Sequence, residues 1–585
     1  MNFKKSLFLD FFLIFVIFLL GLYCSKGLFR EYAFSTHDGD HHISRSFDAI
    51  QSLKEGNFPL RWAGSLNDWC GVPVFNFFYP LIYYEVFLIN FLVKDVINSL
   101  KVIASLSFTI APVFFYLWLK KETRNALASF VGAFLYLFVP YRFSLVYVRF
   151  NPEFVAYTFL PIVLWIESFL LERLRKDKLI SFKTLLIAFV LSLIGGIFIT
   201  SHNFAVMLLV PILVIYSGIK IYLNKIFDKQ KIALLIFVFV SLLGISAFFW
   251  GPMILEKKYV KLNTMWTINY RDHFPELWQV IRSKWDYGSS EVGTEKDGMS
   301  FMLGYSQWLV IGASAFYVIL YIFQKKKSKI PIEIIFWFSV SCLSLFLILP
   351  WSRFVWNNIK ILQEIQFPWR LLGITSFTIA ALSGLFLASI KNKFLLYFLS
   401  VFFLALAFVG NRNHLRPQPS ANPEKYVDYE KNHDHRYATT SIFDDILGKE
   451  SVSLCLPGTS TITSPLDSSI SWVVERGNTF GKISFNNSKK ENISLRLGLE
   501  FFPGTYLMKF NQESVNTIRN CQGRVCLDNL KFYDKENTLE WQIVQSPVER
   551  FFNMITLLTL FAWIAGLFLV LLRKDEKKTR QVVKT

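Results

Sequence analysis

The chain has 585 residues, of which 53% are hydrophobic and only 18% are charged. Soluble globular proteins are about 45–50% apolar and about 25% charged, so this composition, with its long apolar runs, excludes an ordinary soluble enzyme and a disordered protein. The net charge of +19 comes with basic loops between the apolar runs. This positive-inside pattern argues against nucleic-acid binding. The composition predicts an all-α polytopic membrane protein with room for a small water-soluble domain.

Twelve apolar runs have the length of a membrane-spanning helix, roughly 17–22 residues. They fall at 7–23, 100–119, 125–141, 154–171, 181–199, 203–221, 231–250, 303–323, 331–349, 369–389, 393–409 and 551–572. Basic residues gather in alternate loops and at both termini, which is typical of cytoplasmic segments. We therefore expect a multi-pass protein of the cytoplasmic (inner) membrane with both termini in the cytoplasm. The shorter apolar run 79–92 is predicted to be an interfacial or re-entrant helix.

Long polar segments define the expected domains. The predicted boundaries are a transmembrane domain at 1–410 with a first outer loop at 26–78 and a middle outer loop at 251–302, an extracytoplasmic β-rich domain at 411–550, a final helix at 551–572, and a basic cytoplasmic tail at 573–585. Strands are expected at 468–475, 482–486, 493–499 and 505–510, where β-branched or aromatic runs alternate with turn residues. Cys521 and Cys526 lie close together in this domain and are candidates for a local disulfide.

The first outer loop carries acidic residues directly after the first span. Asp38 and Asp40 precede an amphipathic helix that begins near Ile43. Carboxylates at the outer membrane surface would take a proton from an acceptor hydroxyl or hold a hard divalent cation through oxygen ligands. The alternative is structural, with Asp38 as a helix N-cap and Gly39 supplying the turn.

The loop around Asn151-Pro152 is the second candidate. Glu153 follows this turn and Arg149 precedes it. Glu153 either faces the same outer cavity as Asp38 or stabilises the N-terminus of the helix that it begins.

Two further outer turns carry polar residues. His202 lies in a Thr-Ser-His-Asn turn and would either touch a bound headgroup or join a hairpin of spans. Trp369 and Arg370 open a later span. Arg370 would either snorkel to the interface or grip a phosphate with two hydrogen bonds.

The order of these motifs resembles the GT-C superfamily of polytopic membrane glycosyltransferases. The closest resemblance is to a bacterial integral membrane family whose domain is labelled "6-pyruvoyl-tetrahydropterin synthase-related", which is similar to the YfhO-like proteins. The short motifs that carry it, over nearly the whole chain, are Phe78–Tyr84, Asn151–Ala156, Ser201–Asn203, Phe367–Leu372 and Ser546–Asn553.

The resemblance implies transfer of a sugar from a polyprenyl-phosphate donor in the membrane to an envelope glycan, lipid or protein acceptor on the outer face. It puts Asp38 and Asp40 in the place of the essential acid, as base or as ligands of Mg²⁺ or Mn²⁺, and Glu153 in that of a second acid. The substrate-binding residues would be His202, Arg149, Trp369 and Arg370. The later loop has no clear paired-acid motif, which argues against metal dependence.

Two other functions fit the same sequence. About twelve spans are also typical of transporters with two six-span halves, although this chain carries its long segments outside. A non-catalytic envelope protein would use the β-rich domain for assembly, and the outer acids would then cap helices.

Overall fold

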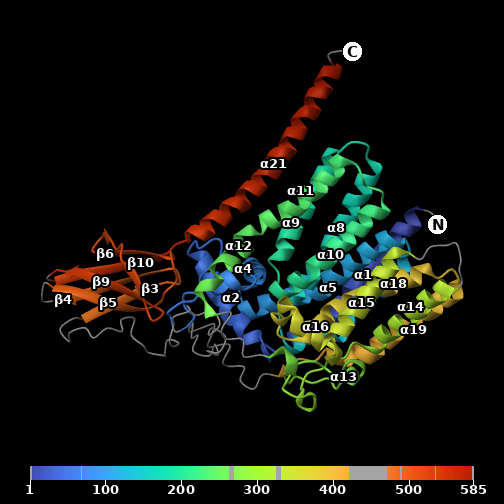
Figure 1. The fold of residues 1–585 in the computed structure, drawn as a ribbon, viewed down its shortest axis with the longest axis horizontal. Helices are drawn as coiled ribbons and strands as arrows, with labels where there is room; N and C mark the ends of the chain where they lie inside the picture. The colour runs from blue at the N-terminus through green and yellow to red at the C-terminus, as the bar shows by residue number, and fades with distance from the viewer. Residues whose placement is uncertain are drawn as a thin grey trace.

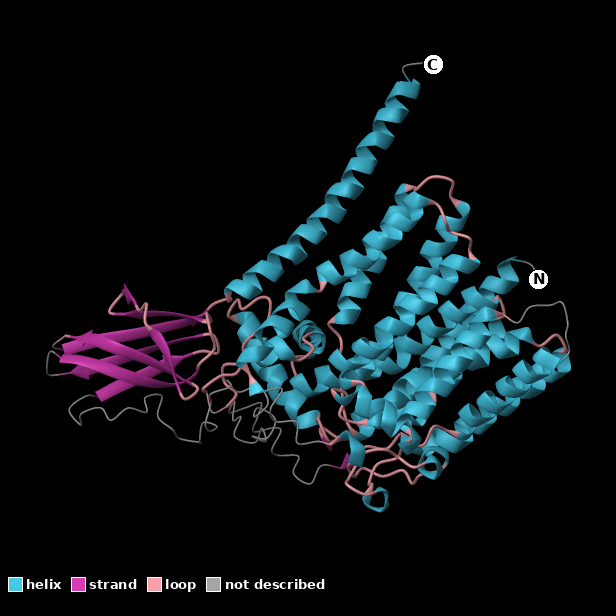
Figure 2. Cartoon of the chain, viewed as in Figure 1, coloured by secondary structure: helices cyan, strands magenta, loops and turns pink. Residues whose placement is uncertain are grey.

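The fold is taken from a computed structural model, which describes residues 3–67, 69–261, 269–323, 331–419, 471–487, 491–533 and 535–582. The described residues form a helical bundle with a β-sheet region beside α2, α4 and α12 (Figures 1 and 2). The final helix α21 leaves the β region and runs past the edge of the bundle.

Eight helices of the described chain are long and apolar enough to cross a membrane. They are α1 (Phe3–Ser25), α5 (Val96–Thr123), α8 (Glu153–Lys176), α9 (Phe182–Ile199), α10 (Asn203–Leu223), α18 (Leu372–Ser389), α19 (Lys393–Asn411) and α21 (Pro547–Val582). α21 continues as helix to Val582, into the segment that was expected to be a basic tail. These helices confirm the prediction of a mainly helical protein suited to a membrane.

Three more candidate spans are bent. They are α6 (Ala126–Leu137) with α7 (Pro140–Phe143), α11 (Lys229–Ile245) with α12 (Ala247–Glu256), and α15 (Ile332–Ile348) with α16 (Arg353–Asn358). The bends are 46°, 63° and 88°, and counting each pair as one span gives up to 11 spans in the described chain. The twelfth predicted span is α14 (Tyr305–Phe323), which is helical but has a shorter apolar stretch.

The segment between α1 and α5 folds against the bundle. It contains β1 (Phe34–Ser35), α2 (Gly39–Lys54), α3 (Val74–Phe77) and α4 (Leu81–Val93). The expected amphipathic helix is α2, and the predicted interfacial helix is α4, whose 13 residues are too few for a straight span. β1 pairs with β2 (Gln418–Pro419), which fixes the residues before α2 beside the end of α19.

The β region consists of two antiparallel sheets around one core. One sheet has the order β3-β4-β10-β6-β7 and the other β5-β9-β8. The strands are β3 (Ser471–Arg476), β4 (Phe480–Asn487), β5 (Glu491–Glu500), β6 (Tyr506–Phe510), β7 (Glu513–Ser514), β8 (Ile518–Cys521), β9 (Arg524–Phe532) and β10 (Lys535–Ile543). Phe485 of one sheet and Phe532 of the other meet in the shared core. A disulfide joins Cys521 to Cys526 across the β8–β9 turn, with 5.9 Å between their Cα atoms.

The β region is bonded to the end of α2. The carboxylate of Glu55 accepts hydrogen bonds from the backbone N–H groups of Asn478 and Thr479, at 3.0 and 2.8 Å. Buried Asp48 accepts from the side chain of Asn478, from Ser65 and from a backbone N–H. These contacts hold the β3–β4 turn against the segment that follows α1.

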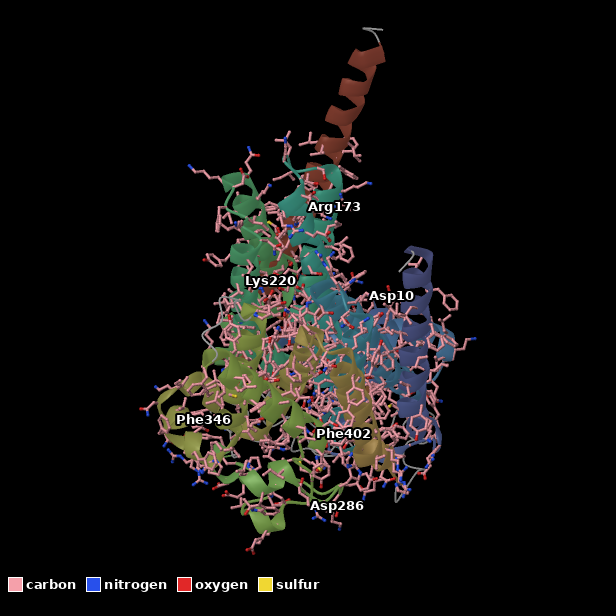
Figure 3. All side chains as sticks on the ribbon, turned by 90° about the vertical axis from the view of Figure 1, so that its right-hand side faces the viewer. Asp10, Arg173, Lys220, Asp286, Phe346 and Phe402 are labelled. Carbon is pink, nitrogen blue, oxygen red and sulfur yellow. A yellow bond between two sulfur atoms is a disulfide. The ribbon has the colours of Figure 1, made fainter. Side chains whose placement is uncertain are left out.

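Charged groups lie at both ends of the bundle and within it. Arg173, in the last turn of α8, lies toward one end, and Asp286, between α12 and α14, lies at the other (Figure 3). Deeper in the bundle, Lys220 of α10 pairs with Glu122 of α5 and, at 3.4 Å, with Glu333 of α15. This buried ion pair network joins three candidate spans.

Candidate functional site

Backbone hydrogen bonds hold Asp38 in place. Its N–H donates to the carbonyl of Arg149 at 2.9 Å, and the N–H of His37 donates to the carbonyl of Val148 at 3.0 Å. The next residue is glycine, because a Cβ at position 39 would come 2.3 Å from Thr36 Oγ1. The segment that carries Asp38 is therefore fixed beside the loop that carries Arg149.

Asp38 occupies the N-cap position of α2, but its side chain makes no capping hydrogen bond. Asp38 Oδ2 instead accepts from Asn151 Nδ2 at 2.8 Å and lies 3.7 Å from Arg149 Nη2. Oδ1 makes no hydrogen bond or ion pair within the described residues, and 29% of the side chain is exposed. The structure thus gives Asp38 one anchored and one open carboxylate oxygen.

Glu153 lies behind Arg149. Its carboxylate is 3.5 Å from Arg149 Nη1 and 3.3 Å from the Tyr141 hydroxyl, and only 3% of its side chain is exposed. The Asn151 side chain accepts the backbone N–H of Glu153 at 3.0 Å and so begins α8. The predicted turn and helix start are present, but Glu153 faces the interior and positions Arg149 instead of facing a cavity.

Trp369 and Arg370 reach the same place from a distant part of the chain. The guanidinium of Arg149 stacks on the Trp369 ring, 4.7 Å from its centroid. Arg370 is half-buried, donates Nη1 to the carbonyl of Ile365 at 3.0 Å, and lies 5.0 Å from the Phe204 ring. Its buried Nε has no hydrogen-bond partner in the described part of the chain.

His202 is buried and caps the helix that follows it. Its Nδ1 accepts the backbone N–H of Ala205 at 3.2 Å, which caps α10. Its ring stacks on Tyr79 with 4.4 Å between the centroids. With 2% of the residue exposed, His202 lies beneath the site, and its contact with a headgroup stays a prediction.

The electrostatics of the site favour an ionised acid among neutral histidines. Burial opposes ionisation of Asp38, but Arg149 and the hydrogen bond from Asn151 outweigh it and lower the pKa of Asp38. Burial, with Arg45 nearby, holds the pKa of His42 well below its usual range. Burial and Arg370 do the same to the pKa of His202. At neutral pH Asp38 carries a negative charge and both imidazoles are uncharged.

We call Asp38, Arg149, Glu153 and Arg370, with the Trp369 ring, the acid–arginine cluster. It gathers predicted residues from the first loop, the α7–α8 connection and the start of α18. Asp40 lies in the first turn of α2, where its carbonyl accepts from Ser44 Oγ at 2.9 Å.

The described residues fit a metal ion poorly. Within them, no group of three or more His, Cys, Asp or Glu side chains is placed to hold one. Arg149 stands between Asp38 and Glu153, and its charge would repel a divalent cation at that point. Metal binding by Asp38 and Asp40 therefore stays a prediction from the resemblance.

Two residues beneath the site, His42 and Arg45, are not among those predicted from the sequence. His42 Nδ1 lies 3.0 Å from the Tyr83 hydroxyl, and buried Arg45 stacks on Phe78 at 4.4 Å. A helical spacing was the available signal: positions 38, 42 and 45 share one face of α2. Because this face of α2 carries an acid, an imidazole and a guanidinium, the pattern indicates that it points toward the site.

The comparisons with known proteins add no family to this description. No family model and no curated protein matches the chain.

Proposed function

We propose that the chain is a membrane glycosyltransferase that moves a sugar from a polyprenyl-phosphate-type donor to an acceptor hydroxyl on an envelope glycan, lipid or protein. The observation that carries the proposal is the meeting of Asp38 with Arg149, beside Trp369 and Arg370. An open carboxylate oxygen next to unsatisfied guanidinium donors is what an acceptor hydroxyl and a donor phosphate require.

The reaction would be a single displacement with inversion. The acceptor oxygen attacks the anomeric carbon of the sugar while the bond from that carbon to the phosphate oxygen breaks. Asp38 accepts the hydroxyl proton at Oδ1, and the bonding electrons leave with the lipid phosphate. Arg370 binds the phosphate as its charge grows, and Glu153 and Trp369 hold Arg149 in position beside it.

The helical bundle supports the choice of a lipid-linked donor. Charged groups near a membrane are costly and are usually retained for function. Arg149 lies within 4 Å of two carboxylates. Within the described residues Arg370 has no carboxylate that close, and it meets Glu153 and Asp38 only at longer range. A bound phosphate would supply the missing negative charge.

The test is sugar transfer by the purified full-length protein from a panel of polyprenyl-phosphate sugars, with added Mg²⁺ or Mn²⁺ and with EDTA. Asp38→Asn should lower the rate by about 10²–10⁴-fold, the usual contribution of a general base. Asp286→Asn is the matched control, because 48% of that side chain is exposed and it pairs with Lys284. This variant should keep the wild-type rate. Asp40→Asn tests whether the second acid takes part in the reaction. The rates with added Mg²⁺ or Mn²⁺ and with EDTA test whether a cation takes part.

Two results would contradict the proposal. One is the consumption of no donor by a folded wild-type protein. The other is an Asp38→Asn variant as active as the wild type.

A further inference from the structure

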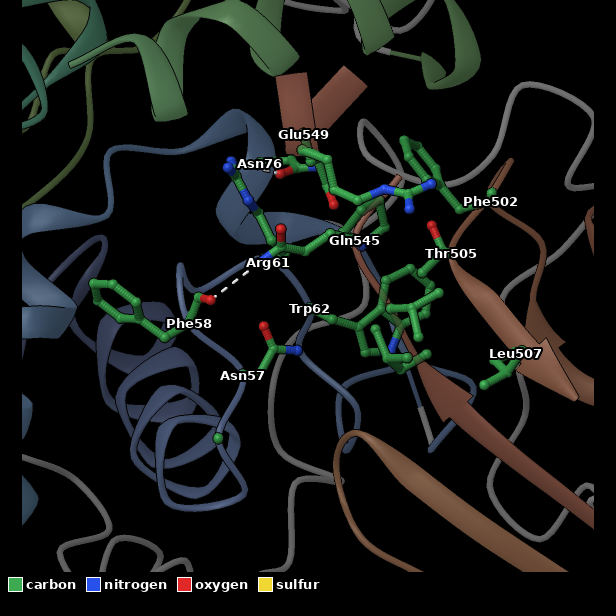
Figure 4. Close-up of a pocket in the computed structure, with 16 residues that line it drawn as sticks. Asn57, Phe58, Arg61, Trp62, Asn76, Phe502, Thr505, Leu507, Gln545 and Glu549 are labelled. Carbon is green, nitrogen blue, oxygen red and sulfur yellow. Dashed lines mark hydrogen bonds between the residues drawn. The ribbon is translucent and has the colours of Figure 1, made fainter. Parts of the chain in front are cut away.

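A cavity lies where the β region meets the first loop and the start of α21. Its volume is about 580 Å³, within the range of about 300–1,000 Å³ that is typical of small-molecule sites. Residues 56–62, α3, β6 and the segment after β10 form its walls (Figure 4). We call it the junction cavity.

The floor of the junction cavity is a buried polar network. Arg61 donates Nη1 to Asn76 Oδ1 at 3.1 Å and Nη2 to Asn553 Oδ1 at 3.0 Å. Asn76 Nδ2 in turn donates to Glu549 at 2.7 Å and to Glu256 at 3.1 Å. Arginine, amide and carboxylate groups thus hold one another in fixed orientations.

Two polar groups in the wall keep unused hydrogen-bonding capacity. Arg61 is 4% exposed, and its buried Nε has no hydrogen-bond partner in the described residues. The half-buried Asn57 amide, which points into the cavity in Figure 4, makes no side-chain hydrogen bond within the same part of the chain. Arg61 Nε is covered by the surrounding residues, so the Asn57 amide marks where a ligand would bind, beside the Arg61–Asn76 network.

The charges in the wall balance one another. Glu549 and Arg550 line the cavity and Glu256 lies behind Asn76, so two carboxylates stand beside the guanidinium groups of Arg61 and Arg550. A charged ligand of either sign would meet no excess of opposite charge. A neutral ligand with many hydroxyl groups, each able to donate and to accept, matches the mixture of amide, guanidinium and carboxylate.

Apolar walls complete the site. Trp62, Phe502 and Leu507 line the cavity opposite the polar groups. Ligand sites commonly combine aromatic walls with a few oriented polar groups, and the C–H face of a sugar ring packs well on such a wall. We propose that the junction cavity is a binding site for a neutral saccharide, held by Asn57 against Trp62.

A short segment of chain links the junction cavity to the residues beneath the acid–arginine cluster. Asn76 of the cavity and Tyr79, which stacks on His202, are three residues apart, so their Cα atoms are separated by at most about 11 Å. The saccharide site does not rest on the proposed transfer reaction. Binding here is measured without a donor lipid, so its failure and that of the transferase proposal are distinguishable.

The experiment is calorimetric titration of the full-length protein with cellobiose, chitobiose and mannobiose. We expect at least one disaccharide to bind with a millimolar or tighter Kd. Asn57→Ala should weaken it by about threefold to tenfold, the usual effect of one lost hydrogen bond. Asn57→Trp should abolish binding by filling the cavity. Gln542→Ala is the control, because the exposed Gln542 side chain lies on the face of β10 opposite to the lining residue Ile543.

Folding is checked by the thermal unfolding midpoint and the gel-filtration profile of each variant. With folding intact, three results overturn the proposal: no heat from any of the three disaccharides, wild-type affinity in Asn57→Trp, or saturable binding of short peptides in place of the sugars.

Discussion

Arg149 organises the acid–arginine cluster at the scale of single residues. Its guanidinium lies between Asp38 and Glu153 and stacks on Trp369. Both ion pairs are longer than a hydrogen bond, at 3.7 and 3.5 Å, so their attraction is mainly electrostatic. Because Glu153 and Trp369 already hold Arg149, the proposed function assigns phosphate binding to Arg370.

We predict that Arg370→Lys raises the KM for the donor by about tenfold while leaving kcat closer to wild type. The lysine keeps the charge but loses the planar donors, including the Nε that has no described partner. The measurement is the initial rate of transfer against donor concentration. Arg353→Lys, at an arginine that bonds the carbonyl of Arg271, is the matched control, and an equal change in both variants would exclude phosphate binding by Arg370.

At the scale of elements, α2 joins the acid–arginine cluster to the β region. Asp38 stands at its first turn and Asp48 near its last, where Asp48 accepts from Ser65 Oγ at 2.7 Å. Burial outweighs these hydrogen bonds and raises the pKa of Asp48 to about 7. The contact between α2 and the β3–β4 turn therefore contains a group that titrates near neutral pH.

The sign of the pH effect follows from the raised pKa. The folded protein binds the Asp48 proton more tightly than the unfolded chain, so this group favours the folded contact at low pH, and the benefit is lost as pH rises through about 7. We predict that the amide protons of Asn478 and Thr479 exchange more slowly at pH 6 than at pH 8, after correction for intrinsic rates. The nearby Glu55 carboxylate accepts these same amides.

Hydrogen exchange with mass spectrometry measures the effect. The pH dependence should vanish in Asp48→Asn, whatever the absolute stability of that variant. It should persist in Asp286→Asn, whose aspartate is exposed and pairs with Lys284. A pH dependence that is unchanged in Asp48→Asn would assign the titration to another group.

The helices were easier to predict from the sequence than the strands. Apolar runs of bilayer length are found as helices because lipid imposes that length directly. The strands β8, β9 and β10 escaped prediction. In β9, Asp528-Asn529 resembles a turn, but Asn529 adopts a φ of 54° within the strand and the register against β5 shifts there. A bulge of this kind is indistinguishable from a turn in the local sequence.

The candidate site was predictable only in part for a similar reason. The polar residues of the connecting loops were identifiable because charge beside a membrane is unusual. Their roles depend on contacts between distant segments. The local sequence does not distinguish Asp38, whose Oδ1 is open, from Glu153, whose carboxylate is buried against Arg149 and Tyr141.

At the scale of the whole molecule, the number of spans decides which segments share a side of the membrane. The connection after α8 and the strand β10 are separated by α9, α10, the α11–α12 pair, α14, the α15–α16 pair, α18 and α19. If α14 crosses the membrane these make an odd number of crossings, and if it does not they make an even number. The β region is hydrogen-bonded to the first loop, and α5, the α6–α7 pair and α8 separate that loop from the connection after α8. The two segments then lie on opposite sides, which requires α14 to cross, although its apolar stretch is shorter than those of the eight straight candidate spans.

We predict that α14 spans, so that Lys178 and Gln542 lie on opposite sides, with Lys178 cytoplasmic as its basic surroundings indicate. Both residues are exposed, so Lys178→Cys and Gln542→Cys should tolerate labelling in intact cells with a membrane-impermeant maleimide. Gln542→Cys should react before lysis and Lys178→Cys only after it. Asp286→Cys is the control, because three candidate spans separate it from Lys178 whether or not α14 crosses. Labelling of Asp286→Cys without Gln542→Cys would show that α14 stays on one side and would move the β region away from the side required for an outer-face transferase.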